Sequence, residues 1–156
     1  MEILIVVIIL GILAAIVIPQ FTNASQDARE SSLLSQLQTL RSQIELYKLQ
    51  HKDVAPDLIT SWNPFLEYSD INGTLSATRD DTATPPVNLG PYMQAKPANP
   101  LLQLDNVKAL GTVDGTCGWT YDVTTGKIHG IAKDGANAFH ETDDGVYDIN
   151  GTIITY

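Results

Sequence analysis

The fold is decided by the first twenty residues, which read MEILIVVIILGILAAIVIPQ from Met1 to Gln20. Between Ile3 and Ile18 the side chains are only those of Ile, Leu, Val, Ala and one Gly. As a helix rising about 1.5 Å per residue, this run covers about 24 Å, a little less than the ~30 Å hydrocarbon core of a bilayer. Its hydrophobicity alone is typical of a short membrane span or of the core of a signal peptide.

The flanks of the run argue against a signal peptide. No Lys or Arg precedes it, and the Ile-Pro-Gln-Phe sequence at residues 18–21 is not a small-residue cleavage site. An acidic residue, Glu2, stands at the start instead. A carboxylate at the edge of an apolar membrane helix is costly unless it is paired, so Glu2 is a candidate functional residue.

The stretch from Glu2 to Phe21 resembles the N-terminal helix of type IV pilins and of type II secretion pseudopilins. The residues at that family's spacing are Glu2, the apolar run, Gly11, Ala14, Ala15 and Pro19. Before the Glu the family has a basic leader, a Gly, an aromatic residue and Thr-Leu-Ile, whereas Met1 stands here. We expect the natural chain to begin upstream of Met1; the alternative is that this copy is not processed in the usual way.

From Asn23 onward the pattern becomes amphipathic. Apolar residues recur at steps of four and three, which predicts one stripe on a helix: Leu33, Leu37, Leu40, Ile44 and Tyr47. No Gly or Pro interrupts residues 22–54, so we predict a single helix over residues 2–51 that is ended by Pro56. Pro19 should bend or locally melt this helix. The stripe should be core, packed against the chain's own sheet.

The resemblance and the patterns together predict an α+β fold, in which a long, pilin-like N-terminal helix with a membrane-embedded first half packs on a small antiparallel β-sheet head. Residues 1–22 would be the transmembrane or filament-core half-helix, and residues 23–156 the periplasmic head. The head divides into an amphipathic half-helix (23–52), a variable loop region (53–90) and a β-rich part (91–156). A short helix is expected around residues 58–68.

Two strands are expected late in the chain, around the turn at residues 123–126. Cys117–Asp122 and Lys127–Ile131 are rich in β-forming residues, and Gly126 can adopt a positive φ at low cost, which predicts a hairpin. Alternation places Trp119 and Tyr121 on one face of it. The apolar run at residues 151–156 is expected to add a short strand.

The charge of the chain is unevenly distributed. Residues 1–52 hold four acids and four bases, so residues 53–156 carry the whole net charge of −9. An acidic head argues against nucleic-acid binding, which relies on basic patches. The single cysteine, Cys117, excludes an internal disulfide and is expected to be a small buried side chain. Many type IV pilins close a C-terminal loop with a cysteine pair, so its absence favours a pseudopilin.

The sharpest local signal for chemistry lies between Asp134 and Asp148, a stretch with five acids and no base. Ca²⁺ takes six to eight oxygen ligands, which such a loop could supply. The stretch resembles the calcium loop of the major type II secretion pseudopilin. That resemblance implies Asp143 and Asp144 as ligands, followed by Asp134. A solvated acidic loop is the alternative.

The remaining patterns do not favour an enzyme. His51, His129 and His140 follow no metal-ligand spacing, and we expect His129 to be a surface or partly packed residue. No nucleophile elbow or phosphate-binding loop is found. By the resemblance, Glu2 and Pro19 have assembly roles, and the Glu2 carboxylate faces the N-terminal ammonium of a neighbouring subunit. The alternative is an interfacial residue at a terminus.

These expectations converge on a non-enzymatic structural subunit of a helical pseudopilus that drives protein export in type II secretion. The implied partners are further copies, minor pseudopilins, the inner-membrane secretion platform and the cytoplasmic membrane. The implied location is the bacterial inner membrane, crossed once, with the head in the periplasm. One alternative is a type IV pilus subunit in an extracellular filament, serving adhesion, motility or DNA uptake. Another is a monomeric membrane-anchored periplasmic binding domain.

Overall fold

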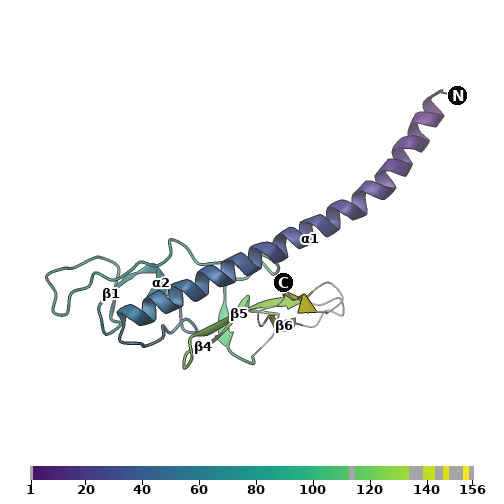
Figure 1. The fold of residues 1–156 in the computed structure, drawn as a ribbon. Coiled ribbons are helices and arrows are strands. Elements are labelled where there is room, and N and C mark those ends of the chain that lie inside the picture. The colour runs from purple at the N-terminus through teal and green to yellow at the C-terminus, as the bar shows by residue number, and fades with distance from the viewer. Residues whose placement is uncertain (1, 113–114, 134–138, 143–145, 148–152, 155–156) are drawn as a thin grey trace.

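A computed structural model describes residues 2–112, 115–133, 139–142, 146–147 and 153–154. The chain is α+β, as predicted, with a long N-terminal helix and small sheets (Figure 1). Its elements are α1 (Glu2–Gln50), α2 (Asn63–Leu66), β1 (Tyr68–Ser69), β2 (Leu75–Ser76), β3 (Val107–Ala109), β4 (Trp119–Asp122), β5 (Lys127–Lys133), β6 (Phe139–Thr142), β7 (Val146–Tyr147) and β8 (Ile153–Ile154).

The helix α1 is continuous over 49 residues, which confirms the predicted single helix within one residue at its end. The predicted bend-or-melt position, Pro19, does not interrupt it, so no local melting occurs there. Figure 1 shows α1 curved along its length, with its N-terminal half projecting away from the sheets. The long helix is therefore a single element whose N-terminal half projects and whose C-terminal half belongs to the head.

The end of α1 lies upstream of the predicted stop at Pro56. Lys52 and Asp53 adopt left-handed backbone angles, with φ of 57° and 64°. The Asp53 N–H donates to the Lys48 carbonyl at 2.8 Å, which satisfies one of the last carbonyls of the helix. The helix is therefore ended by left-handed residues that turn the chain back, before Pro56 acts.

The main sheet contains four strands in the order β3-β4-β5-β6. The predicted hairpin is confirmed, since β4 and β5 pair antiparallel and Gly126 in their turn has φ of 76°. The predicted antiparallel pairing is found among β4, β5 and β6, whereas β3 pairs parallel to β4, contrary to the prediction. Only residues 110–118 lie between these two strands in the sequence. The pairs β1-β2 and β7-β8 form separate two-stranded sheets, and β8 confirms the predicted last strand.

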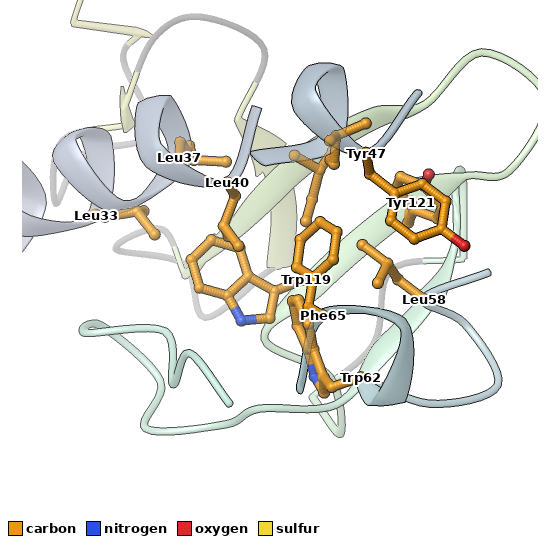
Figure 2. Close-up of a cluster of buried hydrophobic side chains, with 11 residues drawn as sticks. Leu33, Leu37, Leu40, Tyr47, Leu58, Trp62, Phe65, Trp119 and Tyr121 are labelled. Carbon is orange, nitrogen blue, oxygen red and sulfur yellow. The ribbon is translucent and has the colours of Figure 1, made fainter. Parts of the chain in front are cut away.

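The core lies between α1 and the β4–β5 hairpin, as predicted (Figure 2). The whole predicted stripe is buried, and it packs with Trp119, Tyr121 and Ile128 from the sheet. Gly130 lets β5 lie close to α1, because a Cβ at this position would be 2.9 Å from Leu33 Cδ1. The amphipathic half of α1 therefore covers one side of the head's core.

The segment after α1 closes the other side of this core. The helix expected around residues 58–68 is reduced to the four residues of α2, because β1 begins at Tyr68. Phe65 of α2 is fully buried, and Trp62 donates its Nε1–H to the Asp105 carbonyl at 2.7 Å. The Tyr92 hydroxyl donates to Gln50 Oε1 at 2.6 Å, and burial raises the pKa of Tyr92 to about 12, so the group stays a neutral donor.

Truncation of the stripe should destabilise the head. Leu40 is 1% exposed, so Leu40→Ala removes buried methyl groups and leaves a cavity that should lower the free energy of unfolding by about 2–5 kcal/mol. Leu49→Ala is the matched control, because Leu49 lies on the same helix with 83% of its side chain exposed. Urea denaturation followed by tryptophan fluorescence measures both. An equal loss for the two variants would contradict the assignment of the core.

Candidate functional site

The most unusual surface of the chain is the first part of α1. Its large side chains between Ile3 and Ile18 are all exposed, from 81% at Ile3 to 44% at Val17. Gly11 has no atom of the described chain within 4 Å of the place where a Cβ would lie. The described residues therefore leave this apolar segment uncovered on every side.

The predicted assembly residues both lie in this half of α1. Glu2 is the first residue of the helix, and Pro19 lies within it. The positions of their side chains are outside what the structure describes, so their assembly role stays a prediction. In the described part of the chain, no helix is long and apolar enough to cross a membrane.

The predicted calcium ligands fall outside the described residues. These are Asp134, Asp143 and Asp144. Elsewhere, within the described ranges, no group of three or more His, Cys, Asp or Glu side chains is placed to hold a metal ion. The calcium site therefore stays a prediction from the sequence.

Several acids in the described loops have a structural use. Asp57, Asp80 and Asp122 each accept the N–H two residues further on, at distances of 2.8 to 3.1 Å. Each carboxylate also accepts a threonine hydroxyl, and this bond is the main cause of the lowered pKa of all three. These three acids of the head therefore stabilise turns.

Asp70 is the most enclosed of these turn acids, with 5% of its surface exposed. Its Oδ1 accepts the N–H groups of Asn72 and Thr74, both at 2.8 Å. Burial alone would raise the pKa of Asp70, but the hydrogen bonds from Thr74 and Asn72 outweigh it and hold the pKa below its usual value. The ionised form is therefore the one that the folded loop stabilises.

The side chains of two of the three histidines and of the cysteine are described, so their surroundings can be compared with the predictions. The His51 ring stacks on Tyr47 with centroids 3.7 Å apart, and its ring nitrogens lie 2.8 Å from the Tyr47 carbonyl and 2.9 Å from Ser69 Oγ. Cys117 is fully buried, which confirms the prediction. His129 is 8% exposed, so it is more buried than predicted. His51 and Cys117 thus serve packing.

One cavity was missed by the sequence analysis. A pocket of about 370 Å³ lies between α1 and the start of β5, and Arg41 and Lys127 are among its lining residues. The two residues are 86 positions apart, so no local motif links them. The signal that could have found them is the predicted hairpin itself, which brings Lys127 beside the helix that carries Arg41.

Comparison of the chain with protein-family models, with curated proteins and with solved structures found no match. The resemblance to pilins and pseudopilins therefore stays a prediction from the pattern of Glu2–Phe21 and the segments that follow it. The function has to be argued from the chain's own surfaces.

The hydrogen-bonded carboxylates of the turns should make the chain less stable as the pH is lowered. The pKa of Asp70 is lower in the folded chain than the value of about 3.9 for an unfolded chain. The ionised Asp70 therefore adds to the free energy of unfolding at neutral pH. That contribution should be lost as the pH falls below about 4. The free energy of unfolding, measured in urea at neutral and acidic pH, should therefore decrease on acidification.

Two variants measure how much of this loss of stability on acidification is due to Asp70. Asp70→Asn keeps an oxygen acceptor but cannot be protonated in this range, so the variant should show a weaker loss on acidification. Asp27→Asn, at an exposed position on α1, is the control and should keep the wild-type dependence. An unchanged pH dependence in Asp70→Asn would contradict the role of this carboxylate.

Proposed function

We propose that the chain is a structural subunit of a helical filament of the pseudopilus type, which drives protein export in type II secretion. The observation that carries the proposal is the uncovered apolar half of α1, joined without a break to a half that is packed in the head. The proposal assigns the first half to assembly and the second half to folding.

The size of the apolar surface is the first argument. Burial of one large aliphatic side chain is worth about 1.5–3 kcal/mol, and every such residue from Ile3 to Ile18 is at least 44% exposed. Exposed apolar patches of this extent mark interfaces with proteins or membranes. Lipid would cover this apolar segment before assembly. The same segment of other copies would cover it after assembly.

The shape of this surface favours a filament over a closed oligomer. An apolar segment that is exposed all around the helix offers different faces to different neighbours. Contacts between different faces are heterologous, and such contacts generate an open helical array when the rotation does not close. Gly11 is consistent with close helix approach, because no described part of the chain uses the space beside it.

Glu2 supplies the proposed register of this assembly. Its carboxylate, at the start of α1, would pair with the N-terminal ammonium of a neighbouring copy. An ion pair that is removed from water discriminates strongly between registers, because a charge left unpaired there is expensive. The chain would be held in the bacterial inner membrane with its head in the periplasm, and would meet minor pseudopilins and the secretion platform there.

The choice of a pseudopilin over a pilin rests on the sequence. Cys117 is the only cysteine, so the C-terminal cysteine pair of many type IV pilins is lacking. Tyr47-Lys48-Leu49 and Gly90-Pro91-Tyr92 resemble pseudopilin segments. These features favour a short export filament over a long surface filament.

The function is tested by deletion and cross-linking in the bacterium that carries the gene. A pseudopilin predicts loss of protein export on deletion, and a ladder of cross-linked oligomers in membranes of the wild type. Surface filaments with normal export would instead indicate a pilus subunit. A chain that gives no ladder at all would be a monomeric anchored domain, and the filament proposal would then be wrong.

The role of Glu2 gives a prediction about assembly. Glu2→Gln removes the charge but keeps the size, so the ladder should shrink to monomers while the head keeps its wild-type urea midpoint. Asp27→Asn is the control, because it removes an exposed carboxylate from the same helix. Equal ladders for Glu2→Gln and the wild type would refute the assembly role.

The calcium prediction is tested by a thermal melt of the full chain in detergent. A ligand at about 100 times its Kd stabilises by roughly 2.7 kcal/mol, which is worth a few degrees in a domain of this size. Millimolar Ca²⁺ should therefore raise the Tm after EDTA treatment, whereas Mg²⁺ should not. The rise should vanish in the Asp143→Ala, Asp144→Ala double variant. No rise in the wild type would make the stretch a solvated acidic loop.

A further inference from the structure

The turn between β1 and β2 carries a dipeptide, Asn72-Gly73, whose chemistry the proposed function does not use. Asn72 is exposed, and the turn lies beside the C-terminal end of α1 (Figure 1). The Lys52 Nζ donates to Asn72 Oδ1 at 2.7 Å, although the two residues are 20 positions apart. The fold therefore places an ammonium group directly on the side-chain amide of Asn72.

The structure favours a glycine at position 73 on two counts. Gly73 has a φ of 84°, in the left-handed region that favours glycine, and a Cβ there would lie 3.3 Å from the Tyr47 hydroxyl oxygen. A glycine also leaves its own main-chain nitrogen unshielded, because it has no Cβ beside that nitrogen. The turn therefore keeps, directly after Asn72, the residue whose nitrogen can most easily approach the asparagine side chain.

Asp70 holds this turn in place. Its Oδ1 accepts the N–H groups of Asn72 and Thr74, and its carbonyl accepts the Gly73 N–H at 3.0 Å. The bond from Gly73 has to open before the Gly73 nitrogen can react. Because Ile71, Asn72 and Thr74 are all exposed, this local opening requires no rearrangement of the core.

We propose that Asn72 is a site of spontaneous deamidation, in which Lys52 activates the side-chain amide. The main-chain nitrogen of Gly73 attacks Asn72 Cγ, the Cγ–Nδ2 bond breaks, and ammonia leaves with the proton of the Gly73 N–H. Water then opens the resulting succinimide ring by breaking one of its two C–N bonds, which yields aspartate or isoaspartate at position 72. Asparagine and water are thus converted into an acidic residue and ammonia, and nothing is oxidised or reduced.

Lys52 favours this reaction in two ways. During the attack, negative charge develops on Asn72 Oδ1, and an ammonium that already lies 2.7 Å from this oxygen stabilises that charge. After the reaction, the aspartate formed at position 72 has its carboxylate beside the same ammonium. Asp70 is the neighbouring acid, and two N–H groups already bind its Oδ1. The modified turn therefore keeps its contact with the end of α1, while the head gains one negative charge.

The chain contains its own reference for the reactivity of this sequence. The pentapeptide Asp-Ile-Asn-Gly-Thr occurs twice, at residues 70–74 and at residues 148–152. Asn150 lies outside the described residues, but its two neighbours on each side are identical to those of Asn72. A change at Lys52 that alters the rate at Asn72 and leaves the rate at Asn150 unchanged therefore measures the contact with α1, because the local sequence is the same.

The first experiment follows deamidation in the full chain, kept folded in detergent at neutral pH in water labelled with heavy oxygen. Peptide mapping by mass spectrometry measures, over time, the aspartate and isoaspartate that carry the label at positions 72 and 150. The expected result is labelled aspartate and isoaspartate at position 72 of the folded chain. An Asn72 that stays intact there, while the chain unfolded in guanidinium converts, would overturn the proposal. A covalent link between Lys52 and Asn72 would also overturn it, because the lysine would then be the nucleophile.

The variant Lys52→Gln tests the activation of the amide. It keeps a polar side chain but has no ammonium, so the rate at Asn72 should fall about fivefold, the effect expected for the loss of one hydrogen bond. The rate at Asn150 should not change. Lys48→Gln is the matched control, because Lys48 is a cation in the last turn of the same helix and pairs with Glu45. Equal rates at Asn72 in Lys52→Gln and in the wild type would overturn the role of Lys52.

The variant Asn72→Asp tests whether the fold accepts the product. It places the carboxylate beside Lys52 directly, so its urea midpoint at low salt should not fall below that of the wild type. Asn88→Asp is the matched control, because Asn88 Nδ2 donates to Asp81 Oδ1 and the new carboxylate would face an acid, which should lower the midpoint. An equal decrease for the two variants would overturn the pairing with Lys52. None of these measurements requires assembly, so their outcome is separate from that of the filament proposal.

Discussion

Leu33 packs so closely against Gly130 that a Cβ at position 130 would lie 2.9 Å from Leu33 Cδ1, and the leucine side chain would have to shift. Leu33 belongs to the same buried cluster as Trp119 and Tyr121, so this contact is part of the packing that holds the second half of α1 on the hairpin. The large apolar side chains of the first half of α1 lie outside that cluster and are exposed.

Local patterns predicted the elements that need only local information. The apolar stripe predicted α1, and the β-rich runs around Gly126 predicted the hairpin, because each depends on residues close in sequence. The parallel partner β3 was not predicted, because no local sequence pattern indicates which strand pairs with β4 or in which direction. The helix ends within one residue of the predicted position, but the cause differs from the predicted one, because Lys52 and Asp53 adopt left-handed angles before Pro56 is reached.

The candidate site was predictable to the extent that it is continuous in sequence. The apolar half of α1 is a single run, so its exposure followed from its composition. The pocket beside Arg41 was missed because its charges come from α1 and from β5, and only the packing of the hairpin brings them together. From the sequence, turn acids such as Asp70 could only be counted toward the net charge, whereas their hydrogen bonds in the structure give them structural roles.

The unbroken course of α1 has a mechanical consequence. An α-helix of 49 residues is about 73 Å long, and α1 continues without interruption from Glu2 to Gln50. A pull on its apolar end would therefore be transmitted along the helix to the head, where it would act on the buried row from Leu33 to Tyr47.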